Sequence, residues 1–536
     1  REQAWVLVIL GAALTTAAHT LRDESVDDDA ALVVVRDPGL ARAFADRPAV
    51  SLHTLHEENT LLVERERAGV GAWYEFFPRS EGAERMPDGT VRSGTFRTAS
   101  KRLPAVAAMG FDVLYLPPIH PIGEVNRKGP NNTLDAGPGD PGSPWAIGSA
   151  AGGHDAVHPD LGTLEDFRAF VDAAAAQGLE VALDLALQAA PDHPWVTEHP
   201  EWFTTLPDGS IAFAENPPKK YQDIYPVNFD NDPEGIRAEV LRIVHHWIRQ
   251  GVRIFRVDNP HTKPLQFWEW LIRTVNAEHP DVIFLAEAFT RPMPMRALAQ
   301  SGFQQSYSYF TWRNTKTEIE EFFASISDET ADFMRPNLFV NTPDILTEYL
   351  QFGGRPAYRI RAALAATAGA SYGVYAGYEL YENVARPGSE ENIDNEKYEY
   401  KFRDWEAAEA AGDSLAPYLR RLNEIRRAHP ALRQLRGLHV LGSDDDAIVA
   451  YAKHLPAPLS PTGESDTIIV VANVDPHSAR ETTVHVDSEL WGLPRGHDYD
   501  VEDLVTGARW TWNEHNYVRL DAFAEPVHIL HVKARS

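Results

Sequence analysis

Two acidic residues follow apolar segments that have the composition of buried strands. Asp258 ends the first strand in GVRIFRVDNPHTKP (251–264), and Glu287 ends the second in VIFLAEAFTRP (282–292). In a parallel α/β barrel, side chains at the carboxyl ends of the strands form the active face. Two carboxylates there suit a retaining glycosidase-type reaction. One attacks the anomeric carbon to form a covalent sugar–enzyme ester, and the other, kept protonated, donates to the leaving oxygen.

A third acid, Asp344, ends the apolar segment NLFVNTPDI (337–345). A single acid in such a position is often only a helix cap in the following turn. Three acids favour a functional site, because an uncompensated buried charge is strongly destabilising. Arg256 lies two residues before Asp258, and the two-residue period of a strand places both on the inner face of the barrel. A guanidinium there lowers the pKa of the attacking carboxyl.

Strands and helices alternate from about residue 70, which is the pattern of parallel βαβ units. The clearest helix is expected over 162–178, with Thr163 as its cap, Asp166 in its first turn and Gly178 at its end. Another begins at the Asp-Pro pair of residues 232–233. We expect eight strands, at 73–78, 113–119 and 180–187, two ending at Asp258 and Glu287, one around 303–310, and two at 337–345 and 371–380. The predicted fold is therefore α/β, a (β/α)8 TIM barrel with inserted loops.

Three regions are expected along the chain. Residues 1–65 form a partial helical N-terminal region, which we interpret as the remnant of a larger N-terminal module because no initiator Met precedes it. The catalytic barrel covers 66–434 and includes inserted loops at 120–160 and 189–231. Short alternating strands separated by turn residues predict a C-terminal antiparallel β domain over 435–536.

Composition limits the partners and the compartment. The 50 Lys and Arg residues against 78 Asp and Glu residues give a net charge of −28, which argues against nucleic acid or a membrane as a partner. An anionic substrate must then be held by a local basic cluster. The chain has no cysteine, so a reducing, cytoplasmic location is the simpler interpretation. The apolar run from Trp5 to Ala18 is too short to span a bilayer, and we expect a buried or interface helix there.

The acidic motifs resemble those of a known superfamily. FRVDNPH, FLAEAF and FVNTPD have the order and strand positions of the catalytic motifs of the α-amylase superfamily, glycoside hydrolase family 13. The resemblance covers roughly residues 70–430. It implies that Asp258 is the nucleophile, Glu287 the general acid/base, and Asp344 a third acid that binds sugar hydroxyls.

Two departures from ordinary amylases point to one subfamily. Gln188 and Ala189 stand where amylases carry Asn-His, and Thr342 stands where they carry His. The missing Asn is a common calcium ligand, so we expect no bound calcium. No other metal and no cofactor are expected either. These departures, together with ENPPKKYQDIYP, RKGPNN and GSPWAIGS, resemble the bacterial maltosyltransferases (GlgE-type) that extend α-1,4-glucans from α-maltose 1-phosphate. That resemblance also implies a homodimer.

A phosphate leaving group requires hydrogen-bond donors close to the nucleophile. Lys, amide and phenol donors occur on loops of the expected active face, and we predict that they hold the phosphate: Lys128, Asn216, Lys219, Tyr221 and Asn259. Lys220 is expected to face solvent, since adjacent residues in an extended loop point apart. The alternative for this loop is a solvated lysine pair on a surface turn.

Further contacts to the donor are predicted around the same face. Gln188 is expected to hydrogen-bond the phosphate or the first sugar. Lys397 and Tyr398 match residues that hold the outer glucose of the donor in the subfamily, although EKYEYK alone is only a charged loop. Ser143 lies where the subfamily lines the donor pocket. His154 is either close to the first sugar or a structural histidine.

The reaction expected from these residues is a two-step retaining transfer of maltosyl units. Two alternatives are left open. An α-glucan hydrolase or a trehalose-forming isomerase keeps the three acids but does not need the cluster of Lys128 and Lys219, so dependence on phosphate distinguishes it. A non-catalytic glucan-binding protein is the other, and the presence of all three acids argues against it.

Overall fold

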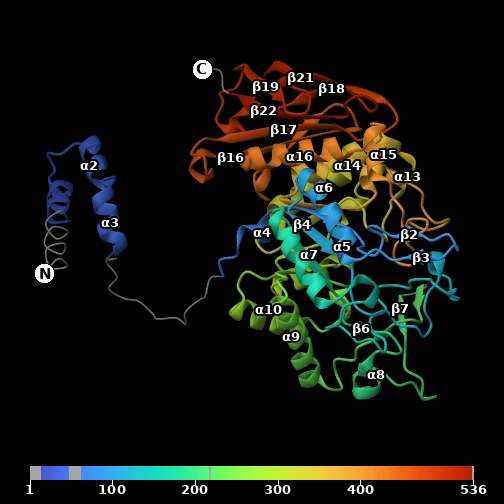
Figure 1. The fold of residues 1–536 in the computed structure, drawn as a ribbon. Helices are drawn as coiled ribbons and strands as arrows, with labels where there is room; N and C mark the ends of the chain where they lie inside the picture. The colour runs from blue at the N-terminus through green and yellow to red at the C-terminus, as the bar shows by residue number, and fades with distance from the viewer. Residues whose placement is uncertain (1–13, 47–61, 217–218, 534–536) are drawn as a thin grey trace. The chain divides into compact units, whose positions relative to one another are not determined.

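The computed structural model describes residues 14–46, 62–216 and 219–533 (Figure 1). The chain divides into two compact units, residues 1–63 and 64–536. In the first unit, residues 14–22 are helical, and helices α2 (Asp28–Val35) and α3 (Pro38–Asp46) follow. The beginning of the apolar run predicted as a helix lies outside the described residues. Among the residues that are described, no helix has both the length and the apolar character needed to cross a membrane.

Eight parallel strands form the centre of the second unit, in the order β12-β11-β10-β5-β4-β1-β14-β13. Their bounds are β1 (Gly71–Glu75), β4 (Val113–Leu116), β5 (Glu180–Leu185), β10 (Ile254–Val257), β11 (Ile283–Ala286), β12 (Gln305–Ser306), β13 (Asn337–Phe339) and β14 (Ser371–Tyr375). A parallel bridge from Ser306 to Pro336 joins the two ends of the sheet. The predicted (β/α)8 barrel is confirmed.

Six strands differ from their predicted bounds; β4, β5, β13 and β14 start where predicted but end earlier, at Leu116, Leu185, Phe339 and Tyr375. The first was expected at 73–78 but begins at Gly71 and ends at Glu75. Pro78 has no N–H to contribute to a ladder, which is one reason why the strand cannot extend that far. The sixth was expected around 303–310 but pairs only over Gln305–Ser306, because the following residues form a short 3-10 helix at Tyr309–Trp312.

Helices surround the barrel, and the two whose starts were predicted begin where expected. Helix α7 (Leu164–Ala176) begins with a complete capping box. The Thr163 side chain accepts the backbone N–H of Asp166, and the Asp166 side chain accepts the backbone N–H of Thr163. Helix α9 (Pro233–Arg249) is capped by Asp232. The other helices of this unit are α4 (Glu66–Gly69), α5 (Phe96–Ala99), α6 (Leu103–Ala108), α8 (Pro194–Glu198), α10 (Leu265–Glu278), α11 (Pro292–Gln300), α12 (Lys316–Ala324), α13 (Glu348–Phe352), α14 (Gly354–Ala368), α15 (Trp405–Ala410) and α16 (Ala416–Ala428).

Alternate residues of the strands, together with Ala68 of α4 and Tyr307 just after β12, form a separate apolar cluster inside the barrel. Its buried members are Ala68, Trp73, Val113, Tyr115, Ala182, Ile254, Ile283, Leu285, Tyr307 and Phe339. Residues of opposite parity, such as Leu114 and Phe255, belong to the larger core beneath the helices. Because the period of a strand is two, the same phase carries Arg256, Asp258 and Glu287 toward the interior.

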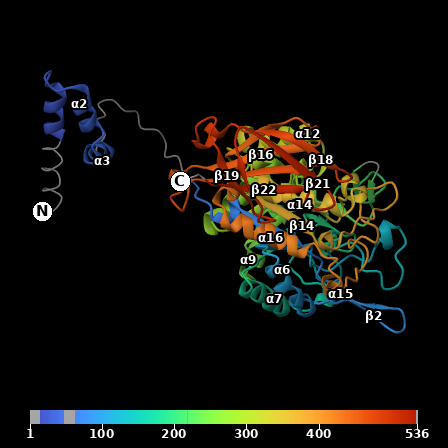
Figure 2. The same cartoon turned by 90° about the horizontal axis from the view of Figure 1, so that it is seen from above.

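An eight-stranded antiparallel sheet follows the barrel, in the order β20-β19-β22-β17-β16-β15-β18-β21. Its strands are β15 (Leu438–Ser443), β16 (Ile448–Leu455), β17 (Asp466–Asn473), β18 (Ala479–His485), β19 (Tyr499–Asp503), β20 (Arg509–Trp512), β21 (His515–Asp521) and β22 (Val527–Lys533). Val470 and Ala472 of β17 join the barrel-side core, whereas Ile469 and Val471 face a core of the sheet's own. The sheet packs on α14 through β17 and β22 (Figure 2). We propose residues 66–434 and 435–536 as the catalytic and C-terminal domains.

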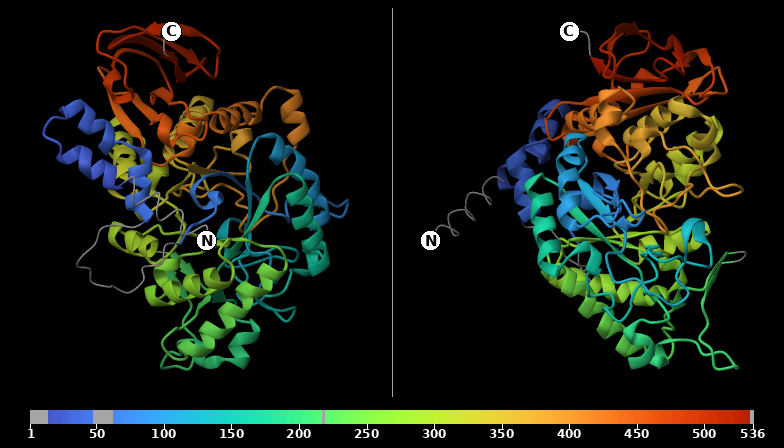
Figure 3. Two further views of the ribbon diagram at one scale, coloured as in Figure 1. Left: turned by 90° about the vertical axis from the view of Figure 1, so that its left-hand side faces the viewer. Right: turned by 45° about the vertical axis from the view of Figure 1, so that its right-hand side comes forward.

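The loop after β5 folds into short hairpins beside the barrel (Figure 3). Strand β6 (Gln188–Ala189) pairs with β9 (Tyr225–Pro226), and β7 (Ala214–Asn216) pairs with β8 (Lys219–Tyr221). A further hairpin joins β2 (Glu84–Arg85) and β3 (Val91–Arg92). The inserted loop predicted at 189–231 therefore contains secondary structure of its own, in the form of short antiparallel strand pairs.

Candidate active site

A cavity of about 810 Å³ opens at the carboxyl ends of the barrel strands. Asp258 and Glu287 enter it directly after β10 and β11, and Asp344 enters it from the loop that follows β13. The three predicted acids are therefore brought to one cavity.

One guanidinium joins the two acids that follow β10 and β11. Nη1 of Arg256 lies 2.9 Å from Oδ1 of Asp258, and Nη2 lies 2.7 Å from Oε1 of Glu287. Nη1 also contacts Oδ2 of Asp184 at 2.8 Å. Two carboxylates held by one guanidinium are close neighbours, as in retaining enzymes, where the separation is about 5–5.5 Å.

The two carboxyls differ in protonation. Burial alone would raise the pKa of Asp258, but the positive charges of Arg256 and Lys263 outweigh it and hold this pKa below its ordinary value. Burial raises the pKa of Glu287 to about 8; the charge of Arg256 opposes that shift and the Asp258 carboxylate adds to it. At neutral pH, therefore, Asp258 is ionised and Glu287 carries a proton. Opposite pKa shifts in a neighbouring pair define one nucleophile and one acid.

The backbone at Asn259 is shaped to support this pair. Asn259 has φ 42° and ψ 54°, the left-handed region, which Asn adopts more readily than most residues. In this conformation its backbone N–H donates to Oε2 of Glu287 at 3.1 Å, and its side-chain amide lies 3.4 Å from Oδ2 of Asp258. The unusual turn therefore places one residue against both acids.

The third acid is paired with a cation. Nζ of Lys397 lies 2.9 Å from Oδ1 and 3.0 Å from Oδ2 of Asp344, and it also lies 5.0 Å from the centre of the Trp145 ring. Burial opposes the charge of Lys397, but the attraction of Asp344 is sufficient to raise the lysine pKa well above its ordinary value. This part of the cavity therefore combines a carboxylate, an ammonium and an aromatic face.

Six predicted binding residues line the same cavity: Ser143, Gln188, Tyr221, Asn259, Lys397 and Tyr398. Arg256 lies beneath it, in contact with the acids, and is 6% exposed. The residues thus converge on one face although they come from five separate parts of the chain.

Lys128 is not among the cavity-lining residues. Its Nζ donates to Oε1 of Gln222 at 2.6 Å, and the residue is only 3% exposed. Burial lowers its pKa, and the nearby Asp223, which does line the cavity, partly offsets that shift. Lys128 therefore does not reach the cavity itself, but lies behind the residues that line it and contacts Gln222.

Two predicted phosphate ligands lie on the β7–β8 hairpin. The backbones of Asn216 and Lys219 pair with each other at its end, but their side chains lie outside what the structure describes. Lys220 is exposed and forms an ion pair with Glu215 at 3.4 Å, as expected for a solvent-facing residue.

His154 has the contacts of a structural histidine. It is 2% exposed, Nδ1 lies 3.1 Å from Nε2 of His193, and Nε2 lies 2.8 Å from the Ala186 carbonyl oxygen. Its ring stacks on Trp195 with centres 4.4 Å apart. Of the two interpretations of His154, this arrangement favours the structural one.

Two charged residues next to the acids, Asp184 and Lys263, were not predicted from the sequence. Asp184, 2% exposed, pairs with Arg256, which it neighbours in the register of β5 and β10. Its position in the inner-facing phase of the predicted strand was the available signal. Lys263 donates to the carbonyl oxygens of Asp258 and Asn259 at 3.3 and 3.2 Å. The signal there was a cation in the short loop directly after Asp258.

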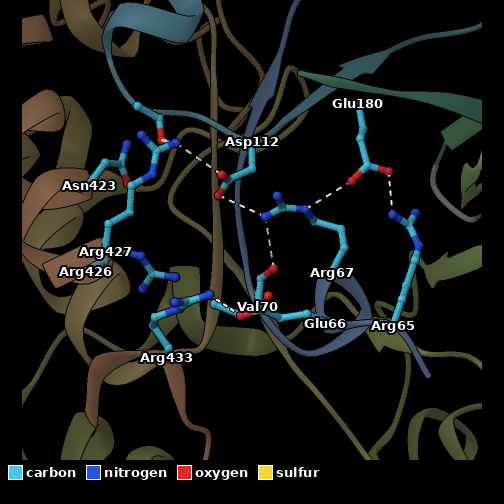
Figure 4. A pocket seen from close by; sticks show the side chains of 11 residues that line it. Arg65, Glu66, Arg67, Val70, Asp112, Glu180, Asn423, Arg426, Arg427 and Arg433 are labelled. Atoms are coloured by element: carbon cyan, nitrogen blue, oxygen red, sulfur yellow. Dashed lines mark hydrogen bonds and ion pairs between the residues drawn. The ribbon is translucent and has the colours of Figure 1, made fainter. Parts of the chain in front are cut away.

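A second cavity of about 490 Å³ lies at the opposite, amino end of the strands (Figure 4). Its lining contains Arg65, Glu66, Arg67, Asp112, Glu180, Arg426, Arg427 and Arg433. Arg67 contacts Asp112 at 3.1 Å and Glu180 at 3.3 Å, and Arg65 contacts Glu180 at 2.6 Å. The charges pair among themselves at the face of the barrel that serves stability, so we assign this cavity no chemistry.

The chain is similar to several known proteins. A family model described as "GLGE, C-terminal" matches residues 440–532. The chain is 56% identical over 524 residues to alpha-1,4-glucan:maltose-1-phosphate maltosyltransferase 2 of Streptomyces coelicolor, with 98% of this chain and 76% of that protein aligned. It is 53% identical over 541 residues to the alpha-1,4-glucan:maltose-1-phosphate maltosyltransferase of Mycobacterium tuberculosis, with 98% and 76% aligned. The solved structure of a maltogenic alpha-amylase, AmyB from Thermotoga neapolitana, matches with a TM-score of 0.65 at 18% identity, covering 88% of this chain and 100% of that one.

The barrel, with the acids at the carboxyl ends of its strands, and the antiparallel sheet that follows give the chain the fold of the α-amylases. Within that class, the extent of the identity is decisive. The chain belongs to the α-1,4-glucan:maltose-1-phosphate maltosyltransferase family.

Proposed function

We propose that this chain transfers maltosyl units from α-maltose 1-phosphate to the non-reducing end of α-1,4-glucans and releases phosphate. The observation that carries the chemistry is the contact of Arg256 with both Asp258 and Glu287 in one cavity, and the opposite directions of their pKa shifts support it. The identity to named maltosyltransferases supports the choice of donor and acceptor.

In the first step, a carboxylate oxygen of Asp258 attacks C1 of the donor. The bond between C1 and the phosphate oxygen breaks, and Glu287 gives its proton to that oxygen. The product is a β-maltosyl ester on Asp258. Arg256 keeps Asp258 ionised beforehand and holds both acids in position.

In the second step, the 4-hydroxyl at the non-reducing end of a glucan enters the cavity. Glu287, now a carboxylate, removes the hydroxyl proton while the oxygen attacks C1. The ester bond breaks and Asp258 leaves as a carboxylate, so two inversions give a new α-1,4 bond. Water must be kept from C1 during this step for transfer to exceed hydrolysis.

The donor contacts are part of the proposal. We assign the binding of the phosphate to Lys128, Asn216, Lys219, Tyr221 and Asn259. Lys128 acts indirectly, through its hydrogen bond to Gln222. We assign the sugars of the donor to Ser143, Gln188, Asp344, Lys397 and Tyr398. The stiff aromatic surfaces of Phe289 and Trp312, which line the cavity, suit the acceptor glucan.

We also propose a homodimer and a cytoplasmic location, without nucleic acid, membrane or cofactor as partners. The family resemblance supports the dimer, and the absence of cysteine and a phosphorylated donor support the location. Light scattering of the purified chain tests the dimer: a mass of twice 59.8 kDa is expected, and the monomer mass at micromolar concentration contradicts it.

The function is tested by running the reaction in reverse, with orthophosphate accepting a maltosyl unit from a glucan. The chain is incubated with a maltooligosaccharide and orthophosphate, and we expect α-maltose 1-phosphate to form only when both are present. Shortening of the glucan at the same rate without phosphate would instead identify a hydrolase.

A further inference from the structure

Three potential metal ligands meet far from the catalytic cavity. His429 caps the end of α16, Asp466 is the first residue of β17, and His531 lies in β22. Strands β17 and β22 are neighbours, with Ile468 opposite His531. The cluster therefore forms where the last barrel helix meets the C-terminal sheet, and none of its members lines the catalytic cavity.

The ligand atoms have the spacing of a small coordination sphere. Nδ1 of His429 lies 3.0 Å from Oδ1 of Asp466, and Nε2 of His531 lies 3.6 Å from the same oxygen. The three atoms all fall within 4.8 Å of one another. A tetrahedral ion with bonds of about 2.1 Å holds its ligand atoms about 3.4 Å apart, between the two observed values.

Hydrogen bonding explains the position of His429 beside Asp466 but not that of His531. The contact of His429 with Asp466 is a normal hydrogen bond, but 3.6 Å is too long for one between His531 and the same oxygen. The two imidazole rings are nevertheless close, with centres 4.6 Å apart. An ion between the three side chains would engage His531 as well.

The carboxylate is fixed from behind and the site is open in front. Oδ2 of Asp466 accepts the backbone N–H of Ala431 at 2.9 Å, which directs Oδ1 toward the histidines. Such outer contacts commonly orient metal ligands. The Asp466 side chain is 8% exposed, whereas that of His531 is 28% exposed, so solvent has access for a fourth ligand.

We propose that His429, Asp466 and His531 form a binding site for a divalent transition metal, with Zn²⁺ as the best fit. Two imidazoles and one carboxylate suit Zn²⁺, and a water molecule would complete the tetrahedron. The bound ion joins the end of α16 to β17 and β22. It clamps the C-terminal sheet to the barrel and takes no part in sugar transfer.

The test is calorimetric titration of the chelator-treated full chain with zinc chloride. We expect one zinc per chain, and at least tenfold weaker binding in His531→Ala and in His429→Ala. Binding should also raise the midpoint of thermal unfolding in the original chain but not in these variants. Maltosyl transfer measured in parallel should stay unchanged, which shows that the variants fold and separates this result from that of the proposed function.

A second cluster among the described residues, His245, Glu278 and His279, provides the matched control. It is more exposed, and Nε2 of His245 lies 3.7 Å from Glu278. The double variant His245→Ala/His279→Ala should bind zinc as the original chain does. Unchanged zinc affinity in His531→Ala, or loss of binding only in the control variant, would overturn the proposal. Cobalt(II) gives a second measurement: intense visible absorption of a four-coordinate ion is expected in the original chain and should be absent from His531→Ala.

Discussion

At the scale of single residues, Arg256 determines the state of the site. Its two terminal nitrogens bind Asp258 and Glu287 separately, and a third acid, Asp184, completes its contacts. Burial raises the pKa of Glu287 to about 8 and that of Asp184 to about 7, whereas the charges of Arg256 and Lys263 hold the pKa of Asp258 below its ordinary value. Glu287 is therefore the acid of this group that holds its proton most strongly.

The pH dependence of kcat/KM follows from these shifts. Activity requires ionised Asp258 and protonated Glu287, so it should be constant near neutral pH and fall about tenfold per pH unit above about 8, as Glu287 loses its proton. On the acidic side it should fall only below the ordinary range of an Asp, because the pKa of Asp258 is lowered. The measurement is the initial rate of phosphate release at low donor concentration. A rate that rises between pH 7 and 9 would contradict the assignment of Glu287 as the acid.

Replacement of the two acids should separate the two steps. Asp258→Ala should abolish maltosyl transfer, since no ester can form. Glu287→Ala should still form the ester when the donor has a good leaving group, such as fluoride, and should release it slowly. Intact-mass spectrometry should then show a maltosyl adduct on Glu287→Ala and none on the double variant with Asp258→Ala. Transfer above background by Asp258→Ala would disprove its role as nucleophile.

At the scale of elements, sequence patterns predict the barrel well and the loops poorly. The capping box at Thr163 and the Asp-Pro start of α9 are local signals, and both appear as expected. Asp258 and Glu287 were predictable because strand phase fixes their direction. The contact between Asp184 and Arg256 was not predicted, because it depends on the register of β5 and β10, which are far apart in the sequence. Lys263 was overlooked although it follows Asp258 in the same loop.

Loss of the α7 cap should weaken the barrel measurably. Thr163→Ala removes the acceptor for the Asp166 N–H, and such caps contribute about 1 kcal/mol. We expect a decrease of that size in the free energy of unfolding, measured with denaturant. Thr205→Ala, the same change at an exposed loop position, should have an effect within about 0.5 kcal/mol. Equal losses in the two variants would show that the cap does not stabilise the fold.

The β7–β8 hairpin should act on the donor and not on the glucan. Lys219→Ala should raise the KM for α-maltose 1-phosphate about tenfold or more, since a charged hydrogen bond to phosphate contributes about 1.5–3 kcal/mol. The KM for maltohexaose should change little. Lys220→Ala, next to it and paired with Glu215, is the matched control and should leave both constants near their original values. Equal effects of Lys219→Ala on both substrates would exclude it as a phosphate ligand.

At the scale of the whole molecule, the C-terminal sheet shares its core with the barrel. Tyr451 of β16 lies fully buried, and its hydroxyl is 2.6 Å from that of Thr367 in α14. Tyr451→Phe should lower the free energy of unfolding by about 1 kcal/mol while leaving kcat unchanged. The control is Tyr517→Phe, which should change the free energy of unfolding less, because Tyr517 is 67% exposed. A loss of activity in Tyr451→Phe without a loss of stability would mean that the sheet affects the site directly.

Phosphate release from α-maltose 1-phosphate, measured with and without maltohexaose and with the products sized, distinguishes a maltosyltransferase from a hydrolase. We predict that phosphate release depends on the glucan and that chains grow by two glucose units per phosphate released. No release from this donor, together with cleavage of maltohexaose in plain buffer, would contradict the account and identify the chain as a hydrolase.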